Sequence, residues 1–263
     1  MDMDRAYNNA DFIPGGADNP DRWLADGRAF RETEAAVGRA RLNVSYGGGA
    51  RQKLDLFHPS GKAAGLVVFV HGGYWMKFDR AYWSHLARGL TARGWAVAMP
   101  SYTLAPEARV HEITREIARA IEAAAPLVAG PIRLAGHSAG GHLAARMGCR
   151  DVVLNDEVRA RLKRIVPISP IGDLRPLLQT ALNDTLGMDM DEAEAESPAL
   201  HAAPDVPVTV WVGAEERPVF LDQARWLAEA WGAVHRIDPG RHHFDVIDGL
   251  EMADSPLVAA ILD

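Results

Sequence analysis

The chain has 263 residues, with 28 lysines and arginines against 35 aspartates and glutamates, which gives a formal net charge of −7. Hydrophobic residues make up 48% and charged residues 24% of the sequence. This composition is that of an ordinary globular protein, so it excludes disorder and collagen-like repeats. A broad nucleic-acid-binding surface is also excluded, because the basic residues occur only in short runs.

The sequence carries no sign of a membrane segment or an export signal. Its apolar runs are short, such as the strand-sized residues 66–70, whereas roughly 18 apolar residues are needed to span a bilayer. The first residues, Met1 to Asp4, are acidic where a secretory signal would begin with basic residues. One cysteine, Cys149, allows neither an internal disulfide nor a cysteine-based metal cluster. We therefore expect a cytoplasmic protein with no nucleic-acid or membrane partner, and the composition leaves a homodimer open.

The chain begins with a polar segment and a hairpin. Residues 1–40 are expected to form an N-terminal arm that contains one helix, at 21–37. Residues 42–46 and 53–57 flank three glycines, and apolar and polar side chains alternate in the second of these stretches. The pair is therefore predicted to form an antiparallel hairpin.

Beyond the hairpin, buried strands alternate with amphipathic helices. Strands are predicted at residues 66–70, 95–99, 131–135, 165–169, 206–212 and 233–237. Helices are predicted at residues 80–92, 110–125, 139–148, 219–231, 244–250 and 256–262. Because each parallel return needs a crossover, this order predicts an α/β fold with a mostly parallel sheet and helices on both faces. We expect a single domain over residues 1–263, since no repeat or low-complexity linker divides it.

An acidic segment at residues 172–204 interrupts the alternation. It contains short helical patterns but no strand. In α/β proteins ligands bind at the carboxyl ends of the strands, and an insertion between strands commonly covers that edge. The segment is therefore predicted to form a small helical lid.

The motif Gly136-His137-Ser138-Ala139-Gly140 fits the pattern G-x-S-x-G, between a predicted strand and a predicted helix. A serine on such a sharp turn has strained backbone, and the flanking glycines relieve the crowding around it. The turn lifts the hydroxyl to the N-terminus of the helix, where the dipole favours developing negative charge. Ser138 is thus predicted to be a nucleophile; the alternative is a small-residue turn that only lets helix and sheet pack closely.

A second glycine motif, His71-Gly72-Gly73-Tyr74-Trp75, directly follows the strand at 66–70. Consecutive glycines allow backbone N–H groups to converge on one point, as the oxyanion of acyl transfer requires, and losing one such donor costs about 3 kcal/mol. Ala139, the residue after the serine, is expected to supply a further donor. Alone, the motif could be a flexible turn, but it stands one strand–helix–strand unit before the serine.

Three segments together resemble the α/β-hydrolase superfamily: residues 71–75, Pro100 to Glu107 and Gly136 to Gly141. Within it the chain is similar to the esterases related to hormone-sensitive lipase. The H-G-G-Y-W form and the start Tyr7-Asn8-Asn9 resemble the metal-independent kynurenine formamidases, also called arylformamidases. The resemblance implies an α/β-hydrolase fold over roughly residues 40–263, with no metal and no other cofactor. The lipase branch has a third glycine where this chain has Tyr74, so the donors Gly72, Gly73 and Tyr74 remain alternatives.

The same resemblance implies the partners of the serine, which follow it in the order acid, then histidine. The acid stands three residues after a glycine that ends a strand, which matches Glu216, although aspartate is more common there. The adjacent Glu215 is the alternative. The histidine directly precedes a phenylalanine, which matches His243. The implied triad is therefore Ser138, Glu216 and His243.

Substrate binding is expected from the insertion and from residues near the oxyanion loop. Trp75 and Tyr102 are the aromatic candidates, and Asp173 is a candidate for orienting the substrate. Taken together, the sequence predicts a serine hydrolase that cleaves a small carboxylic ester or aryl formamide. The alternatives are an N-formylkynurenine formamidase specifically, or a catalytically silent protein of this fold that binds a ligand. A nucleotide-binding protein is disfavoured, because no glycine-rich phosphate loop is present.

Overall fold

The computed structural model describes residues 2–263, so Met1 of the acidic start lies outside the described residues. An eight-stranded sheet with the order β1-β2-β4-β3-β5-β6-β7-β8 forms its centre. The strands are β1 (Ala40–Ser45), β2 (Lys53–Phe57), β3 (Leu66–Val70), β4 (Ala96–Pro100), β5 (Ile132–His137), β6 (Leu162–Ile168), β7 (Thr209–Gly213) and β8 (Val234–Asp238). β2 runs antiparallel to both β1 and β4, and all other pairs are parallel. The predicted hairpin and mostly parallel sheet are confirmed.

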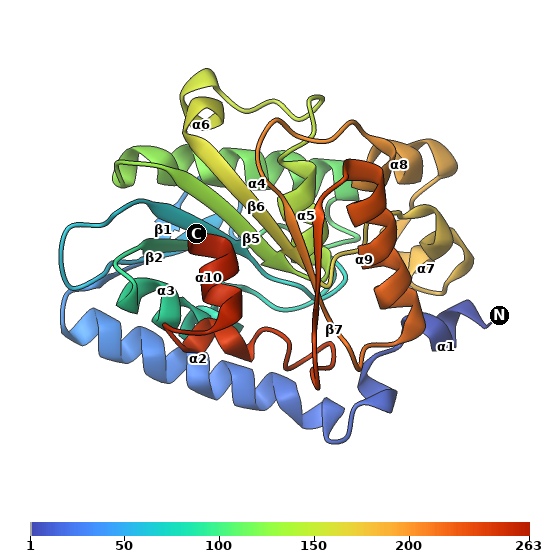
Figure 1. Ribbon diagram of the computed structural model, residues 1–263, viewed down its shortest axis with the longest axis horizontal. Coiled ribbons are helices and arrows are strands. Elements are labelled where there is room, and N and C mark those ends of the chain that lie inside the picture. The colour runs from blue at the N-terminus through green and yellow to red at the C-terminus, as the bar shows by residue number, and fades with distance from the viewer. Residues whose placement is uncertain (1) are drawn as a thin grey trace.

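Helices cover both faces of this sheet (Figure 1). They are α1 (Met3–Tyr7), α2 (Asn19–Ala36), α3 (Arg88–Ala92), α4 (Val110–Ala124), α5 (Ala139–Arg146), α6 (Asp156–Arg161), α7 (Asn183–Leu186), α8 (Met190–Ala195), α9 (Pro218–Trp231) and α10 (Pro256–Leu262). α4, α5 and α9 contribute to the core on one face, and α2, α3 and α10 to the core on the other. None of the helices in the described part of the chain is long and apolar enough to cross a membrane.

The central strand β3 explains why the sheet needs cover on both sides. Its five residues are all buried, and successive side chains of a strand point to opposite faces. Leu66, Val68 and Val70 join the core under α4 and α5, whereas Val67 and Phe69 join the core under α2 and α10. An apolar run of this kind is stable only between two helical layers.

Two predicted helices are wrong in form. Residues 80–92 form two short 3-10 helices, Arg80–Tyr82 and Ser84–Ala87, before α3. Arg80, at the start of the first 3-10 helix, is buried. Its side chain turns inward, and its Nε donates to Asp55 Oδ1 at 2.9 Å. Residues 244–250 form turns followed by a 3-10 helix, Asp248–Glu251.

Residues 244–250 do not form a regular helix because nearby side chains bind their backbone N–H groups. The His242 amide donates to Asp245 Oδ1 at 2.6 Å, and His242 Nδ1 accepts from the amides of Phe244 and Asp245, both at 3.2 Å. These side chains satisfy N–H groups that a regular helix would otherwise use.

The segment at residues 172–204 contains no strand, as its pattern indicated. It forms α7 and α8 together with two 3-10 helices, Arg175–Gln179 and Pro198–Leu200. Figure 1 shows α7 beside α1, on the side of the molecule where α9 begins. The N-terminal end of the chain and the insertion therefore meet at one edge of the fold.

Candidate active site

Ser138 occupies the sharp turn between β5 and α5. Its backbone angles are φ 57° and ψ −119°, a conformation that non-glycine residues rarely adopt. The flanking glycines are sterically required: a methyl group at Gly136 would overlap the carbonyl of Gly140, and one at Gly140 would overlap the carbonyls of Val70 and His71. The pentapeptide therefore packs against the end of β3, as the nucleophile motif demands.

His243 and Glu216 form a buried hydrogen-bonded pair. His243 Nδ1 lies 2.7 Å from Glu216 Oε2, and the two residues are 3% and 6% exposed. Because the carboxylate can only accept, Nδ1 carries the proton and Nε2 is left with a free lone pair. Glu215, the alternative acid, is exposed on the surface. The geometry thus brings Glu216, and not Glu215, to the histidine.

Two further donors hold the Glu216 carboxylate. Its Oε1 accepts from the Gly213 amide at 3.0 Å and from the hydroxyl of Ser169. Ser169 is fully buried just beyond β6 and has a positive φ of 46°. No sequence motif pointed to Ser169. The only signal that could have found it is its position at the carboxyl end of a strand beside that of the acid.

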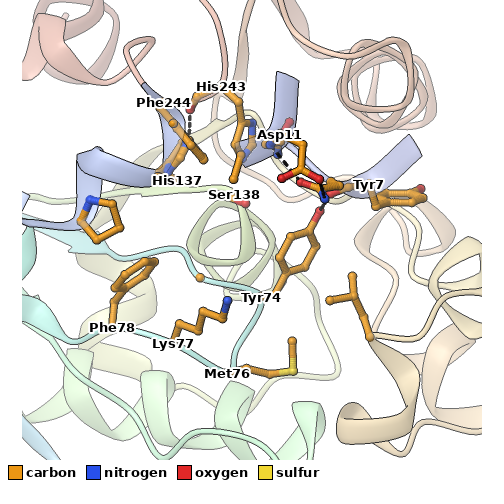
Figure 2. Close-up of a pocket in the computed structure, with 18 of the residues that line it drawn as sticks. Tyr7, Asp11, Tyr74, Met76, Lys77, Phe78, His137, Ser138, His243 and Phe244 are labelled. Carbon is orange, nitrogen blue, oxygen red and sulfur yellow. Dashed lines mark hydrogen bonds between the residues drawn. The ribbon is translucent and has the colours of Figure 1, made fainter. Parts of the chain in front are cut away.

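Ser138 and His243 line the same cavity, and Figure 2 shows the imidazole next to the serine side chain. Among the described residues, the structure has no hydrogen bond between the Ser138 hydroxyl and His243. In ligand-free enzymes the hydrogen bond between nucleophile and base is often long and tightens only when substrate is bound. The three residues of the expected triad are thus brought together at the carboxyl edge of the sheet.

The loop at residues 71–75 faces the serine. A methyl group at Gly72 would come within 3.1 Å of Ser138 Cβ, so the loop and the elbow are in close contact. Gly73, Tyr74 and Trp75 all have positive φ, of 109°, 52° and 58°. In the part of the chain that is described, the amides of Gly72, Gly73, Tyr74 and Ala139 donate no hydrogen bond. They are therefore available to an oxyanion, as expected for this loop.

Three buried histidines surround the site without being its base. Burial lowers the pKa of His71 to about 4, that of His142 to about 3, and that of His137 well below its usual range. They are neutral at pH 7. His137 Nε2 lies 2.8 Å from the His243 carbonyl oxygen and holds the loop that carries the base (Figure 2).

The cavity itself has a volume of about 780 Å³, within the ordinary range for small-molecule sites. Its wall is mainly apolar and aromatic, with rings from Trp23, Tyr74, Phe78, Trp83 and Phe244. A large part of the lining comes from the first twenty residues, and the insertion contributes only Ala181, Leu182 and Thr185.

The three expected substrate-binding residues are not among the residues that line this cavity. Trp75 and Tyr102 are fully buried. The Trp75 ring packs edge-on against His142, and Tyr102 stacks on His71 at 4.3 Å while its hydroxyl donates to the His71 carbonyl. Asp173 pairs with Arg175 at 2.7 Å. Trp75 and Tyr102 therefore support the loop, and Asp173 is engaged within the insertion.

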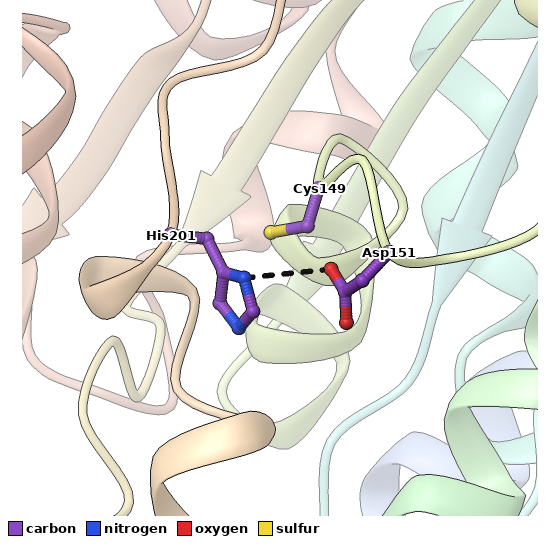
Figure 3. A group of neighbouring side chains, drawn as sticks. All are labelled: Cys149, Asp151 and His201. Atoms are coloured by element: carbon purple, nitrogen blue, oxygen red, sulfur yellow. Dashed lines mark ion pairs between the residues drawn. The ribbon is translucent and has the colours of Figure 1, made fainter.

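Away from the cavity, Cys149, Asp151 and His201 gather ligand atoms within 4.8 Å of one another (Figure 3). Arg146 already donates to both oxygens of the Asp151 carboxylate, at 3.1 and 2.6 Å. Burial raises the pKa of the Cys149 thiol to about 11, so it is protonated at neutral pH. The Asp151 carboxylate of this group is thus already paired with the buried guanidinium of Arg146.

Comparisons with known proteins show which family and fold the chain resembles. Residues 67–235 match a family model described by the alpha/beta hydrolase fold. A kynurenine formamidase from Danio rerio is 30% identical over 73% of this chain and 69% of its own. One from Drosophila melanogaster is 28% identical over 97% of this chain and 94% of its own. The crystal structure of a Silicibacter protein, described as a suspected thioesterase, is 56% identical, covers 100% of both chains and has a TM-score of 0.97.

Proposed function

This chain belongs to the alpha/beta hydrolase fold family, and we propose that it is a serine hydrolase that cleaves a small carboxylic ester or an aryl formamide. One observation carries the proposal. His243 lines the same cavity as Ser138 and is held by the buried Glu216, and the strained backbone of Ser138 presents its hydroxyl at the start of α5. An arrangement of this kind activates a hydroxyl for acyl transfer.

The first half-reaction follows from the tautomer of the histidine. Glu216 holds the proton on Nδ1, so Nε2 accepts the proton of the Ser138 hydroxyl as its oxygen bonds to the substrate carbonyl. The charge that develops on the carbonyl oxygen is stabilised by the free amides of the oxyanion loop and of Ala139. His243 then donates the proton to the leaving alcohol or amine, and the acyl group remains on the serine.

The second half-reaction reverses the roles with water. His243 takes a proton from water, the hydroxide attacks the acyl-serine, and the released acid leaves Ser138 with its proton restored. Glu216 stabilises the imidazolium in both steps. Its three hydrogen bonds, from His243, Ser169 and Gly213, hold the carboxylate in one orientation.

The cavity supports a substrate with an aryl group, because most of its wall is aromatic or apolar. N-formylkynurenine amide hydrolysis is the second candidate, favoured by the similarity to the two kynurenine formamidases. A silent ligand-binding role is less well supported, since serine, acid and histidine are all present and the latter two are hydrogen-bonded.

The test compares wild type with Ser138→Ala. We expect the variant to lose fluorophosphonate labelling and about 10⁴-fold or more of its p-nitrophenyl acetate turnover, while keeping the fold by circular dichroism. Undiminished labelling of the variant would overturn the nucleophile assignment. On wild type, kcat/KM for N-formylkynurenine measured beside those for short-chain aryl esters and an aryl thioester separates the candidate activities.

A further inference from the structure

Residues 3–20 form a wall of the cavity. This part of the expected arm at residues 1–40, called the N-terminal arm from here on, consists of α1, the 3-10 helices Ala10–Phe12 and Gly16–Asp18, the turns between them and the first two residues of α2. It supplies more of the cavity lining than any other segment: Asp4, Tyr7, Asn8, Asn9, Ala10, Asp11, Gly16, Ala17 and Pro20. A substrate that fills the cavity would therefore touch the arm.

The oxyanion loop is tied directly to this arm. The hydroxyl of Tyr74 donates to the backbone carbonyl of Tyr7 at 2.6 Å, across a sequence separation of 67 residues (Figure 2). Burial raises the pKa of Tyr74 well above its usual value, so the hydroxyl keeps its proton and remains a donor. Since the Tyr74 backbone has a positive φ and one of the free amides, a shift of its side chain would move that amide.

The arm is also tied to the side of the site that carries the acid and the base. Arg217, next to Glu216, donates from Nε to the Ala6 carbonyl at 2.9 Å, and its guanidinium lies 3.6 Å from the centre of the Phe12 ring. Tyr7 packs edge-on against Phe220, whose ring lies 4.3 Å from the imidazole of His243.

A third tether joins the arm to the insertion. The Ala181 amide donates to Asp4 Oδ1 at 2.6 Å, and Ala181 lines the cavity as well. The arm thus bridges the oxyanion loop, the start of α9 and the insertion. The bridges to the oxyanion loop and to the insertion are each one hydrogen bond, whereas several contacts join the arm to the start of α9.

We propose that the N-terminal arm is the specificity wall of this active site and that Tyr74 is the positioning residue that couples it to the oxyanion loop. The arm accepts the aryl-sized part of the substrate remote from the scissile carbonyl. Contact of that part with the arm favours the docked arm, and the docked arm holds Tyr74 in the orientation that directs its amide to the oxyanion. This inference rests on the proposed serine-hydrolase function.

The experiment measures a ratio of two substrates. 2-Naphthyl acetate carries an aryl leaving group that could contact the arm, whereas vinyl acetate carries the same acyl group without an aryl part. We expect Tyr74→Phe, which deletes only the hydroxyl, to lower the ratio of their kcat/KM values about fivefold, the value of one hydrogen bond. Phe12→Ala, whose ring lies outside the cavity lining, should lower it about threefold. Hydrogen exchange of residues 3–12 should rise in both.

The controls separate this inference from the function on which it rests. Phe12→Tyr keeps the ring under Arg217 and should restore the wild-type ratio, and Met252→Ala, exposed on another surface, should not change it. Fluorophosphonate labelling is measured on every protein, because its absence from wild type contradicts the serine-hydrolase function itself. With labelling intact, an unchanged ratio in Tyr74→Phe and Phe12→Ala overturns the proposal. Unchanged exchange of the arm in both variants also overturns it, since the arm would then not depend on these contacts.

Discussion

Two walls enclose the cavity, and the protein builds them in different ways. The reacting wall consists of Ser138, the loop at residues 71–75 and His243, with Glu216 behind the imidazole, and all of them follow the ends of parallel strands. The arm wall consists of residues 3–20 with a small part of the insertion, and no strand contributes to it. The reacting wall is therefore held by the sheet, whereas the arm wall depends on a few isolated contacts. The reaction needs its catalytic groups in a fixed geometry, whereas substrate selectivity can reside in irregular segments, which vary more in sequence and conformation.

The largest effect expected on the reacting wall comes from its acid. Glu216→Gln keeps the size of the side chain but presents an amide to His243, which disturbs the tautomer and removes the charge that steadies the imidazolium. We expect kcat to fall about 10³- to 10⁴-fold for every substrate, with no change in substrate ratio. Steady-state kinetics on the two acetate esters measure this.

The neighbouring carboxylate provides the matched control for that variant. Glu215→Gln changes an exposed residue one position away and should leave kcat within twofold of wild type. If Glu215→Gln were the inactive variant and Glu216→Gln the active one, the roles of the two residues would be reversed. If Glu216→Gln lowered kcat much more for one ester than for the other, the reacting wall would also contribute to selectivity, contrary to the comparison of the two walls.

A smaller but still severe effect is expected where the elbow packs against β3. In Gly140→Ala the new methyl group would overlap two backbone carbonyls, and neither can move without shifting β3 or α5. We expect unfolding free energy to fall by about 3 kcal/mol or more, and activity to fall with it. Urea denaturation checks this. Gly48→Ala, in the open hairpin turn where a methyl group meets nothing, is the control and should remain within about 0.5 kcal/mol of wild type.

The contrast between the walls also explains what could be predicted from the sequence. The nucleophile and the oxyanion loop were identifiable because each lies within a short motif whose glycines answer a local steric need, and the histidine was identifiable from the family resemblance through the phenylalanine that follows it. Glu216 could not be separated from Glu215 in this way, since only the fold decides which carboxylate faces the imidazole. Ser169 lies outside any motif and was missed.

The arm wall left a single signal, the start Tyr7-Asn8-Asn9 that carries part of the family resemblance, and nothing in it indicated that these residues face the cavity. Its contacts join residues 67 and 216 positions apart, as in the bonds from Tyr74 to Tyr7 and from Gln223 to Tyr7. Trp75 was assigned to the substrate because it stands beside a glycine loop. The presence of an aromatic residue in the sequence does not show which way its ring points. In the structure the Trp75 ring lies in the core against His142. Side-chain direction after a turn with positive φ is a tertiary property, which spacing along the chain does not encode.

The smallest effect is a loss of unfolding free energy at acid pH. It concerns the reacting wall, since His71, His137 and His142 are buried and neutral near it, whereas the described arm contains no histidine. The pKa of His142 is about 3 when folded, against 6.5 as the ordinary value, so the unfolded chain binds the extra proton between these limits. Its contribution to stability is full above pH 6.5 and declines as pH falls, by about 1.4 kcal/mol per pH unit. His142→Gln retains a donor for the Glu196 carbonyl but does not titrate. Between pH 7 and pH 5, the variant should therefore lose about 2 kcal/mol less unfolding free energy than wild type, as measured by urea denaturation. An identical loss in both proteins would mean that His142 takes up its proton without unfolding, and that this wall is more open to water than its burial indicates.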